Sequence, residues 1–141
     1  MRKIAALFLL LPLVFTGCDI VTPVSKRGDF KSLSGDPVIT RKPMQLHELD
    51  YALNKYDDRY ELDSGSQGMP LVGVIPKGHP VFFQKVLHRT GFNTDDIYLV
   101  GTLEFRGKTY PITYSPAGLD PEKYNYQSLR ESLSYDFVVP K

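Results

Sequence analysis

The sequence predicts a small, mainly β domain, and three observations lead to that prediction. Eleven glycines and eleven prolines among 141 residues provide for many turns. Nine tyrosines and eight phenylalanines are residues favoured in strands. Short apolar or alternating runs follow one another in the second half of the chain, separated by turn-forming residues. We therefore expect a small, curved antiparallel sheet with one or two short helices, while an α+β fold remains an alternative.

Four segments in the second half have the composition of strands. The run 71–75 is apolar and too short for a helix, and residues 81–88 are rich in β formers. Residues 97–105 and 108–114 alternate, and the tight connection at Arg106 and Gly107 predicts that they form a hairpin. Pro111 has no N–H to donate, so its strand should be an edge strand or have a bulge at this residue. Two further short strands are expected at residues 59–62 and 135–139.

Two segments have the spacing of helices. Leu46, Leu49, Leu53 and Tyr56 recur at intervals of three, four and three, which predicts a helix over residues 45–56 with this face packed in the core. Asp120, Pro121 and Glu122 form a helix-start signal, with the aspartate as N-cap. Together with later apolar residues at helical spacing, this signal predicts a short helix over residues 121–133.

The amino terminus has the composition of a secretory signal. Arg2 and Lys3 are followed by an apolar run of twelve residues over 4–15. At about 1.5 Å per residue a helix of this run would span roughly 18 Å, which is short of the ~30 Å hydrocarbon core. We therefore expect residues 1–17 to be a cleaved signal peptide, with an uncleaved anchor as an alternative.

The end of this leader resembles the bacterial lipobox. Thr16 and Gly17 precede Cys18, and Phe15 stands where the family usually has leucine or another aliphatic residue. The resemblance implies cleavage between Gly17 and Cys18, and a diacylglyceryl group and an N-acyl chain such as palmitate on Cys18. Cys18 is also the only cysteine, so acylation would consume the only free thiol in an oxidising envelope. The alternative is an ordinary signal peptide beside an incidental cysteine.

The residues after the cysteine bear on location and domain organisation. Asp19 is similar to the signal that retains enteric lipoproteins in the inner membrane, which slightly favours that membrane over the outer one. The following residues are rich in serine, glycine, lysine and proline, so we expect residues 18–37 to form the lipidated N-terminus and a flexible tether. A single β-rich domain over residues 38–141 would then face the periplasm. Its strand, glycine-containing turn and strand around residues 75–78, followed by a hairpin, loosely resemble bacterial SH3-like barrels.

Residue patterns for catalysis or metal binding are absent from the sequence. The three histidines, His47, His79 and His88, have no metal-ligand spacing. The adjacent aspartates at 57–58 and 95–96 are expected to be solvated loop charges, the second pair in a polar loop over residues 91–96. The net charge of +1 and the lack of a basic block argue against nucleic acid as a partner. We therefore expect no enzyme, no metal and no cofactor besides the covalent lipid.

Tyrosine is the residue that most suggests a recognition surface, because it gives large contact area at small entropic cost. Tyr98, Tyr110 and Tyr114 are the candidates, although Tyr98 would face away from the other two, and core packing is the alternative. The sequence thus favours a membrane-anchored, non-catalytic protein-binding or scaffold module with a partner in the envelope. The alternative is an inhibitor or immunity lipoprotein that neutralises a periplasmic toxin or wall-degrading enzyme.

Overall fold

The computed structural model describes residues 20–24, 35–50, 59–63, 68–93, 95–120 and 122–141. These residues form nine strands and one helix, which confirms the mainly β prediction. The strands and the helix, in chain order, are β1 (Ile20–Pro23), β2 (Val38–Thr40), β3 (Met44–Glu48), β4 (Tyr60–Asp63), β5 (Leu71–Ile75), β6 (Pro80–Thr90), β7 (Asp95–Phe105), β8 (Lys108–Tyr114), α1 (Tyr126–Leu133) and β9 (Phe137–Val138).

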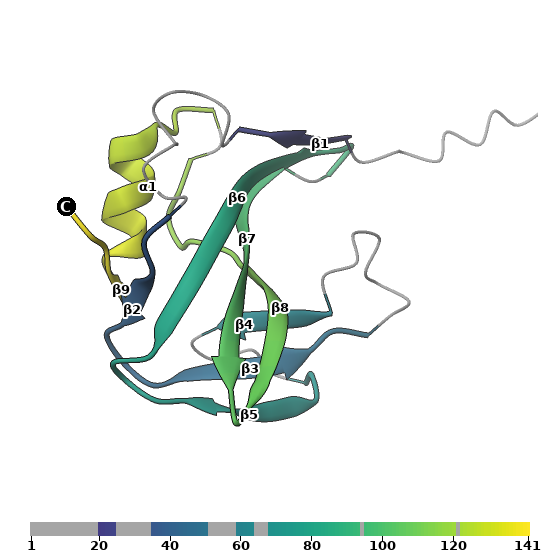
Figure 1. The fold of residues 1–141 in the computed structure, drawn as a ribbon. Coiled ribbons are helices and arrows are strands. Elements are labelled where there is room, and N and C mark those ends of the chain that lie inside the picture. Colours follow the sequence, from purple (N-terminus) through teal and green to yellow (C-terminus); the bar gives the residue numbers. More distant parts are fainter. Residues whose placement is uncertain (1–19, 25–34, 51–58, 64–67, 94, 121) are drawn as a thin grey trace, which may run out of the picture.

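All nine strands belong to one curled sheet in the order β5-β3-β4-β8-β7-β6-β2-β9, with β1 paired to β6 outside this order. The pairs are antiparallel, as expected, except for β4 and β8, which run parallel. Figure 1 shows β6, β7 and β8 crossing over β3, β4 and β5, while α1 lies beside β2 and β9. The sheet is therefore an open half-barrel, consistent with the small curved sheet that was expected.

The hairpin of β7 and β8 is the part of the fold that local sequence predicts best. Phe105 pairs with Lys108 across a two-residue turn in which Arg106 has φ 52° and Gly107 has φ 76°. Positive φ at both positions is the turn geometry that matches the twist of two antiparallel strands. β4 pairs with β8 only from Ile112 onward, so Pro111 has β7 as its one described neighbour, as a residue without an N–H requires.

A bulge in β6 contributes to the curvature of the sheet. The register of β6 against β7 shifts between Phe83 and Lys85, which leaves Gln84 as the extra residue. Opposite the bulge, a Cβ added to Gly101 would lie 2.0 Å from the carbonyl oxygen of Phe82. Only glycine admits this approach of the two backbones, and bulges of this kind bend and twist the strand that carries them.

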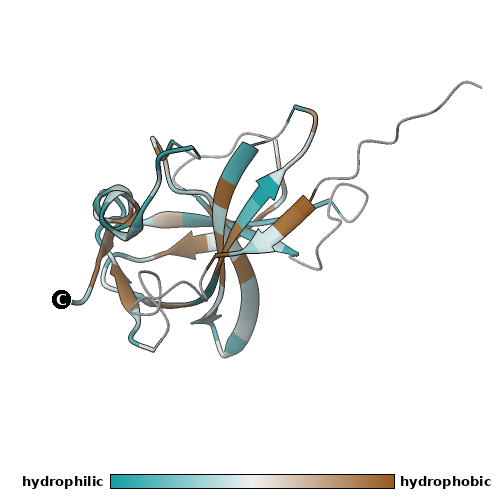
Figure 2. Ribbon diagram, turned by 90° about the horizontal axis from the view of Figure 1, so that it is seen from above, coloured by the Kyte–Doolittle hydropathy of each residue, from teal (hydrophilic) through white to brown (hydrophobic). Residues whose placement is uncertain are grey.

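The core fills the concave side of the sheet and the space under α1. Figure 2 shows hydrophobic residues on the strands around the middle of the molecule. Phe83, Tyr114 and Phe137 form an aromatic cluster in which the Phe137 ring meets the other two edge-on, at centroid distances of 5.5 and 5.0 Å. Leu129 and Leu133 of α1 are fully buried against this core. The helix therefore closes one side of the half-barrel.

The structure contradicts the predicted helix over residues 45–56. Residues Met44–Glu48 are a strand that pairs with β4 on one side and β5 on the other, and residues 51–58 lie outside the described part. Met44 and Leu46 are fully buried, so the period of two holds here. Leu46 is compatible with either period. The pairing of this backbone with segments distant in sequence decides the outcome.

The second helix is shorter than predicted. It begins at Tyr126, after Asn125, whose side chain accepts a hydrogen bond from the backbone N–H of Ser128 in a capping box. Asp120 instead accepts a hydrogen bond from the backbone N–H of Glu122, two residues later, and so stabilises a turn. Pro121 lies outside the described residues. The predicted end at Leu133 is confirmed.

The sheet begins earlier in the chain than predicted. β1 pairs with β6 from Ile20 opposite Thr90 to Pro23 opposite Leu87, and the N–H of Val24 donates to the carbonyl oxygen of Val86 at 2.9 Å. Val24 is 2% exposed. Residues 20–24 are thus part of the fold, so the expected flexible tether over 18–37 is wrong there; residues 25–34 lie outside the described part.

Candidate functional site

Among the described strands, β5 forms one end of the sheet order and has exposed apolar side chains. β5 pairs with β3 on one side, and no strand of the described residues pairs with its other side. Its sequence, Leu-Val-Gly-Val-Ile, contains neither a charge nor a proline. Leu71 is 55% exposed and Val74 is 49% exposed. Edge strands that are apolar and uncharged are templates for pairing with another chain.

Two contacts hold this edge in place. Gly73 packs directly under the ring of Phe105, since a Cβ at Gly73 would lie 2.7 Å from Cε1 of Phe105. Beyond the end of β5, the hydroxyl of Thr40 donates to the carbonyl oxygen of Pro76 at 2.8 Å and accepts from the N–H of His79 at 2.8 Å. The edge is therefore presented by a fixed strand rather than by a loop.

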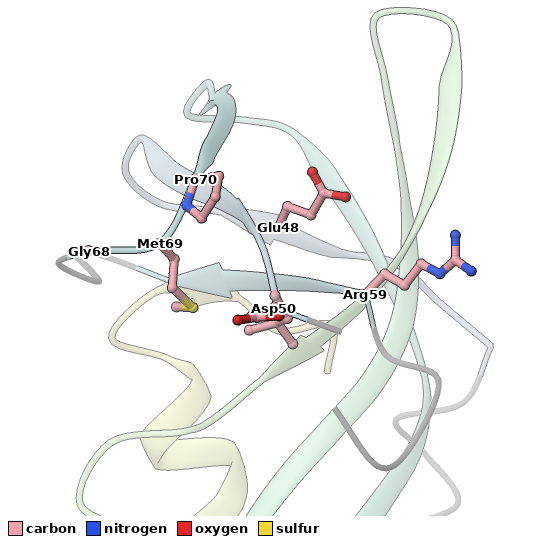
Figure 3. Close-up of a pocket in the computed structure, with 7 residues that line it drawn as sticks. Glu48, Asp50, Arg59, Gly68, Met69 and Pro70 are labelled. Carbon is pink, nitrogen blue, oxygen red and sulfur yellow. The ribbon is translucent and has the colours of Figure 1, made fainter. Parts of the chain in front are cut away.

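A groove adjoins the beginning of β5. It has a volume of about 610 Å³ and lies between the end of β3, the residue before β4 and the segment that leads into β5 (Figure 3). It is lined by Glu48, Leu49, Asp50, Arg59, Gly68, Met69 and Pro70. Two backbone hydrogen bonds join these segments. The N–H of Glu48 donates to the carbonyl oxygen of Pro70, and the N–H of Leu49 donates to the carbonyl oxygen of Arg59. The charged side chains of the groove therefore lie near the beginning of β5, on the side of this strand that faces β3 and β4.

Behind the groove lies His47, which is 3% exposed. Its Nδ1 is 3.2 Å from the carbonyl oxygen of Met69, and its Nε2 is 3.0 Å from Oε1 of Gln45. Glu61 lies opposite His47 on β4. Burial raises the pKa of the Glu61 carboxyl, the charge of Asp63 raises it further, and the charge of His47 lowers it. These contacts give His47 a structural role, because they connect β3 to the segment before β5.

The three tyrosines predicted as a binding surface are buried. Tyr98 is 6% exposed, Tyr110 9% and Tyr114 3%. Tyr110 packs edge-on against Tyr60, with ring centroids 5.0 Å apart. Ile97 and Leu99 on either side of Tyr98 are also buried, so both faces of β7 are covered at this point. The predicted tyrosine surface is wrong, and the alternative of core packing is confirmed.

The aspartates at 95 and 96 lie in β7 and not in the predicted loop. Oδ1 of Asp95 is 2.6 Å from Nε2 of His88, and Asp96 accepts two hydrogen bonds from the guanidinium of Arg89, at 2.9 and 2.7 Å. Each pair joins residues that oppose or nearly oppose each other on β6 and β7. Arg89 and Asp96 therefore form an ion pair across β6 and β7, and His88 and Asp95 form a cross-strand side-chain contact beside it. The aspartates at 57 and 58 lie outside the described residues.

Gly17, Cys18 and Asp19 also lie outside the described residues, and the description begins at Ile20. Within the described ranges, no group of three or more His, Cys, Asp or Glu side chains is placed to hold a metal ion. The same part of the chain has no helix that is long and apolar enough to cross a membrane. No protein-family model, no curated protein and no solved structure matches the chain significantly.

The exposed edge of β5 is a site that the sequence analysis did not single out. The run 71–75 was correctly predicted to be a strand, but which strand ends a sheet depends on pairing between distant segments. One signal was present in the sequence. Charged side chains and prolines commonly protect edge strands, and this strand contains neither.

Proposed function

We propose that this chain is a lipid-anchored lipoprotein of the bacterial cell envelope whose domain binds an extended segment of another envelope protein along β5. The single observation that carries the binding role is the exposed, uncharged outer edge of β5. An extended peptide that adds to such an edge gains main-chain hydrogen bonds, and side-chain contacts supply specificity. Leu71 and Val74 would supply apolar contacts.

Photo-cross-linking in the native envelope tests the binding role. A photoreactive phenylalanine analogue replaces Val74 on the β5 edge in one full-length protein and Val138 on β9 in a matched control. Both valines are 49% exposed, and they lie on the strands at the two ends of the sheet order. We expect an adduct with one defined protein from position 74 and none from position 138. Equal adducts at both positions, or none at either, would contradict the proposal.

The identity of the adduct separates the scaffold role from the alternative of an inhibitor or immunity lipoprotein. A structural or assembly protein supports the scaffold role. A toxin or wall-degrading enzyme whose activity falls when this domain is added supports the inhibitory role instead. In either case Leu71→Lys should remove the adduct from position 74, because a charge on this edge disfavours strand pairing.

The lipid anchor rests on the leader sequence. More than one acyl chain, at ~0.8 kcal/mol per buried CH₂, would hold the protein durably at the membrane. Globomycin treatment or Cys18→Ala should therefore leave a larger precursor, and membrane fractions should lose the mature form. If the mature size and the membrane fraction stay unchanged in Cys18→Ala, the anchor proposal is wrong. Fractionation of an Asp19→Ser protein tests inner-membrane retention, since the variant should move toward the outer membrane.

A further inference from the structure

The tip of the β6–β7 hairpin carries the most exposed aromatic residue among the described ones. Phe92 lies between the end of β6 at Thr90 and the start of β7 at Asp95, and it is 93% exposed. Full burial of a phenylalanine side chain is worth about 1.5–3 kcal/mol, so exposure of this ring is costly unless something covers it. Its neighbour Asn93 is also exposed, and the core of the domain does not reach this tip.

A second exposed apolar residue lies beside the hairpin. Ile20, the first residue of β1, is 64% exposed and pairs with Thr90 at the end of β6. The hydroxyl of Thr90 donates to the carbonyl oxygen of Ile20 at 3.4 Å. The start of the described chain is thus attached to the same end of the hairpin that carries Phe92.

Chain connectivity places Cys18 close to this end. Ile20 lies two positions after Cys18 in the chain, which allows at most about 7 Å between their Cα atoms. A paired strand adds roughly 5 Å and the two residues from Thr90 to Phe92 add at most about 7 Å. The Cα atoms of Cys18 and Phe92 therefore lie within roughly 20 Å of each other in any conformation of residues 18 and 19. Because β1 pairs with β6, Cys18 is held closer to the hairpin than a long flexible tether would hold it.

The two aspartates near the tip have side-chain partners on β6. Asp96 forms an ion pair with Arg89, and Asp95 lies within hydrogen-bond distance of His88. Paired charges suffer less repulsion from anionic lipid headgroups than free carboxylates would. Figure 1 shows β1 at the opposite end of the molecule from β5, so a surface that covers the hairpin tip leaves the β5 edge accessible.

We propose that the β6–β7 hairpin tip inserts Phe92, with Ile20 beside it, into the headgroup layer of the membrane that holds the lipid anchor. This inference rests on the proposed anchor at Cys18. Aromatic side chains partition favourably into the interface between headgroups and acyl chains. The contact sets the orientation of the domain on the bilayer, with the β5 edge directed away from the lipid.

Tryptophan fluorescence tests this contact, because the natural sequence contains no tryptophan. The full-length lipidated Phe92→Trp protein is reconstituted in vesicles of phosphatidylethanolamine and phosphatidylglycerol. Its emission should shift to shorter wavelength on reconstitution and should be quenched by lipids brominated near the headgroup. Asn93→Trp, which keeps Phe92, should show the same response. Tyr135→Trp is the control, because Tyr135 is 76% exposed and lies after α1, away from the hairpin.

Flotation of the vesicles distinguishes the two proposals. If the protein fails to float with the vesicles, the lipid anchor is wrong and the orientation falls with it. If the protein floats but both tip variants keep the emission of a water-exposed indole, the anchor stands and the hairpin contact is overturned. Equal quenching of the Tyr135→Trp control would also overturn it, since the domain would then have no preferred orientation.

Discussion

The hydroxyl of Tyr114 donates a hydrogen bond to Oδ2 of Asp136 across 2.6 Å in the interior of the domain. Oδ1 of the same carboxylate is 2.7 Å from Nζ of Lys42. Burial raises the pKa of Tyr114, and the hydrogen bond to Asp136 and its charge raise it further. The hydroxyl therefore stays protonated as a donor, and one carboxylate joins β8, the segment before β3 and the turn after α1.

Tyr114→Phe should lower the free energy of unfolding by about 1–3 kcal/mol, because it leaves a buried carboxylate oxygen without its donor. Urea denaturation of the purified domain measures the change. Tyr135→Phe is the matched control: that ring is 76% exposed, so its variant should stay within about 0.5 kcal/mol of the parent. Equal stabilities of the Tyr114→Phe protein and the parent would show that Lys42 alone satisfies Asp136.

Gly101→Ala should be among the most damaging small substitutions in the chain. The new Cβ would lie 2.0 Å from the carbonyl oxygen of Phe82, and this backbone is held by the bulge in β6. Overpacking of this kind costs about 1–3 kcal/mol or more. Gly73→Ala is the comparison, because its Cβ would meet the ring of Phe105, a side chain that can turn. Thermal unfolding should show a larger loss for Gly101→Ala, and the reverse order would contradict the role given to the bulge.

Glu61→Gln should stabilise the protein near neutral pH. Burial raises the pKa of Glu61 in the folded state, so the unfolded chain loses its proton first as the pH rises, and ionisation then costs folding free energy. The advantage of the variant should be present at pH 7 and should shrink as the pH falls below the ordinary pKa of glutamate, where both states are protonated. Urea denaturation at pH 7 and near pH 3.5 compares the two, with Glu48→Gln on the neighbouring strand as control. A difference that does not vary with pH would contradict this account.

Thr40→Val should loosen the turn between β5 and β6. The hydroxyl of this buried threonine serves both the carbonyl oxygen of Pro76 and the N–H of His79, so the change leaves two backbone groups without a partner. We expect a loss of about 1–3 kcal/mol in the free energy of unfolding. Thr109→Val, at an exposed position of β8, is the control and should be nearly neutral. Faster amide exchange at Gly78 and His79 in Thr40→Val alone would locate the effect.

Local sequence predicted the second half of the fold well. Residues 71–75 and 108–114 are strands with the predicted bounds, and the turn at Arg106 and Gly107 has the geometry that a two-residue hairpin needs. Each of these features depends on residues close together in the chain. The leader and Cys18 stay predictions, because they lie outside the described residues.

The candidate site was predicted only in part. The β5 strand was expected, but its place at the end of the sheet was not, and the tyrosines offered as a surface lie in the core. Alternation along a strand tells which side chains share a face; it does not tell whether that face is covered. Tyr98 illustrates this. It lies on the face opposite to Tyr110 and Tyr114, and it is nevertheless buried, because both faces of β7 are covered there.

The amino-acid sequence by itself therefore determined the mainly β character, the central hairpin and the pattern of the leader. Only the tertiary structure decided that residues 44–48 form a strand, that residues 20–24 join the sheet, and that β5 ends it. The physical reason is that turns and alternation arise from neighbouring residues. Strand partners are chosen by backbone hydrogen bonds and burial between segments many residues apart, which no local pattern encodes.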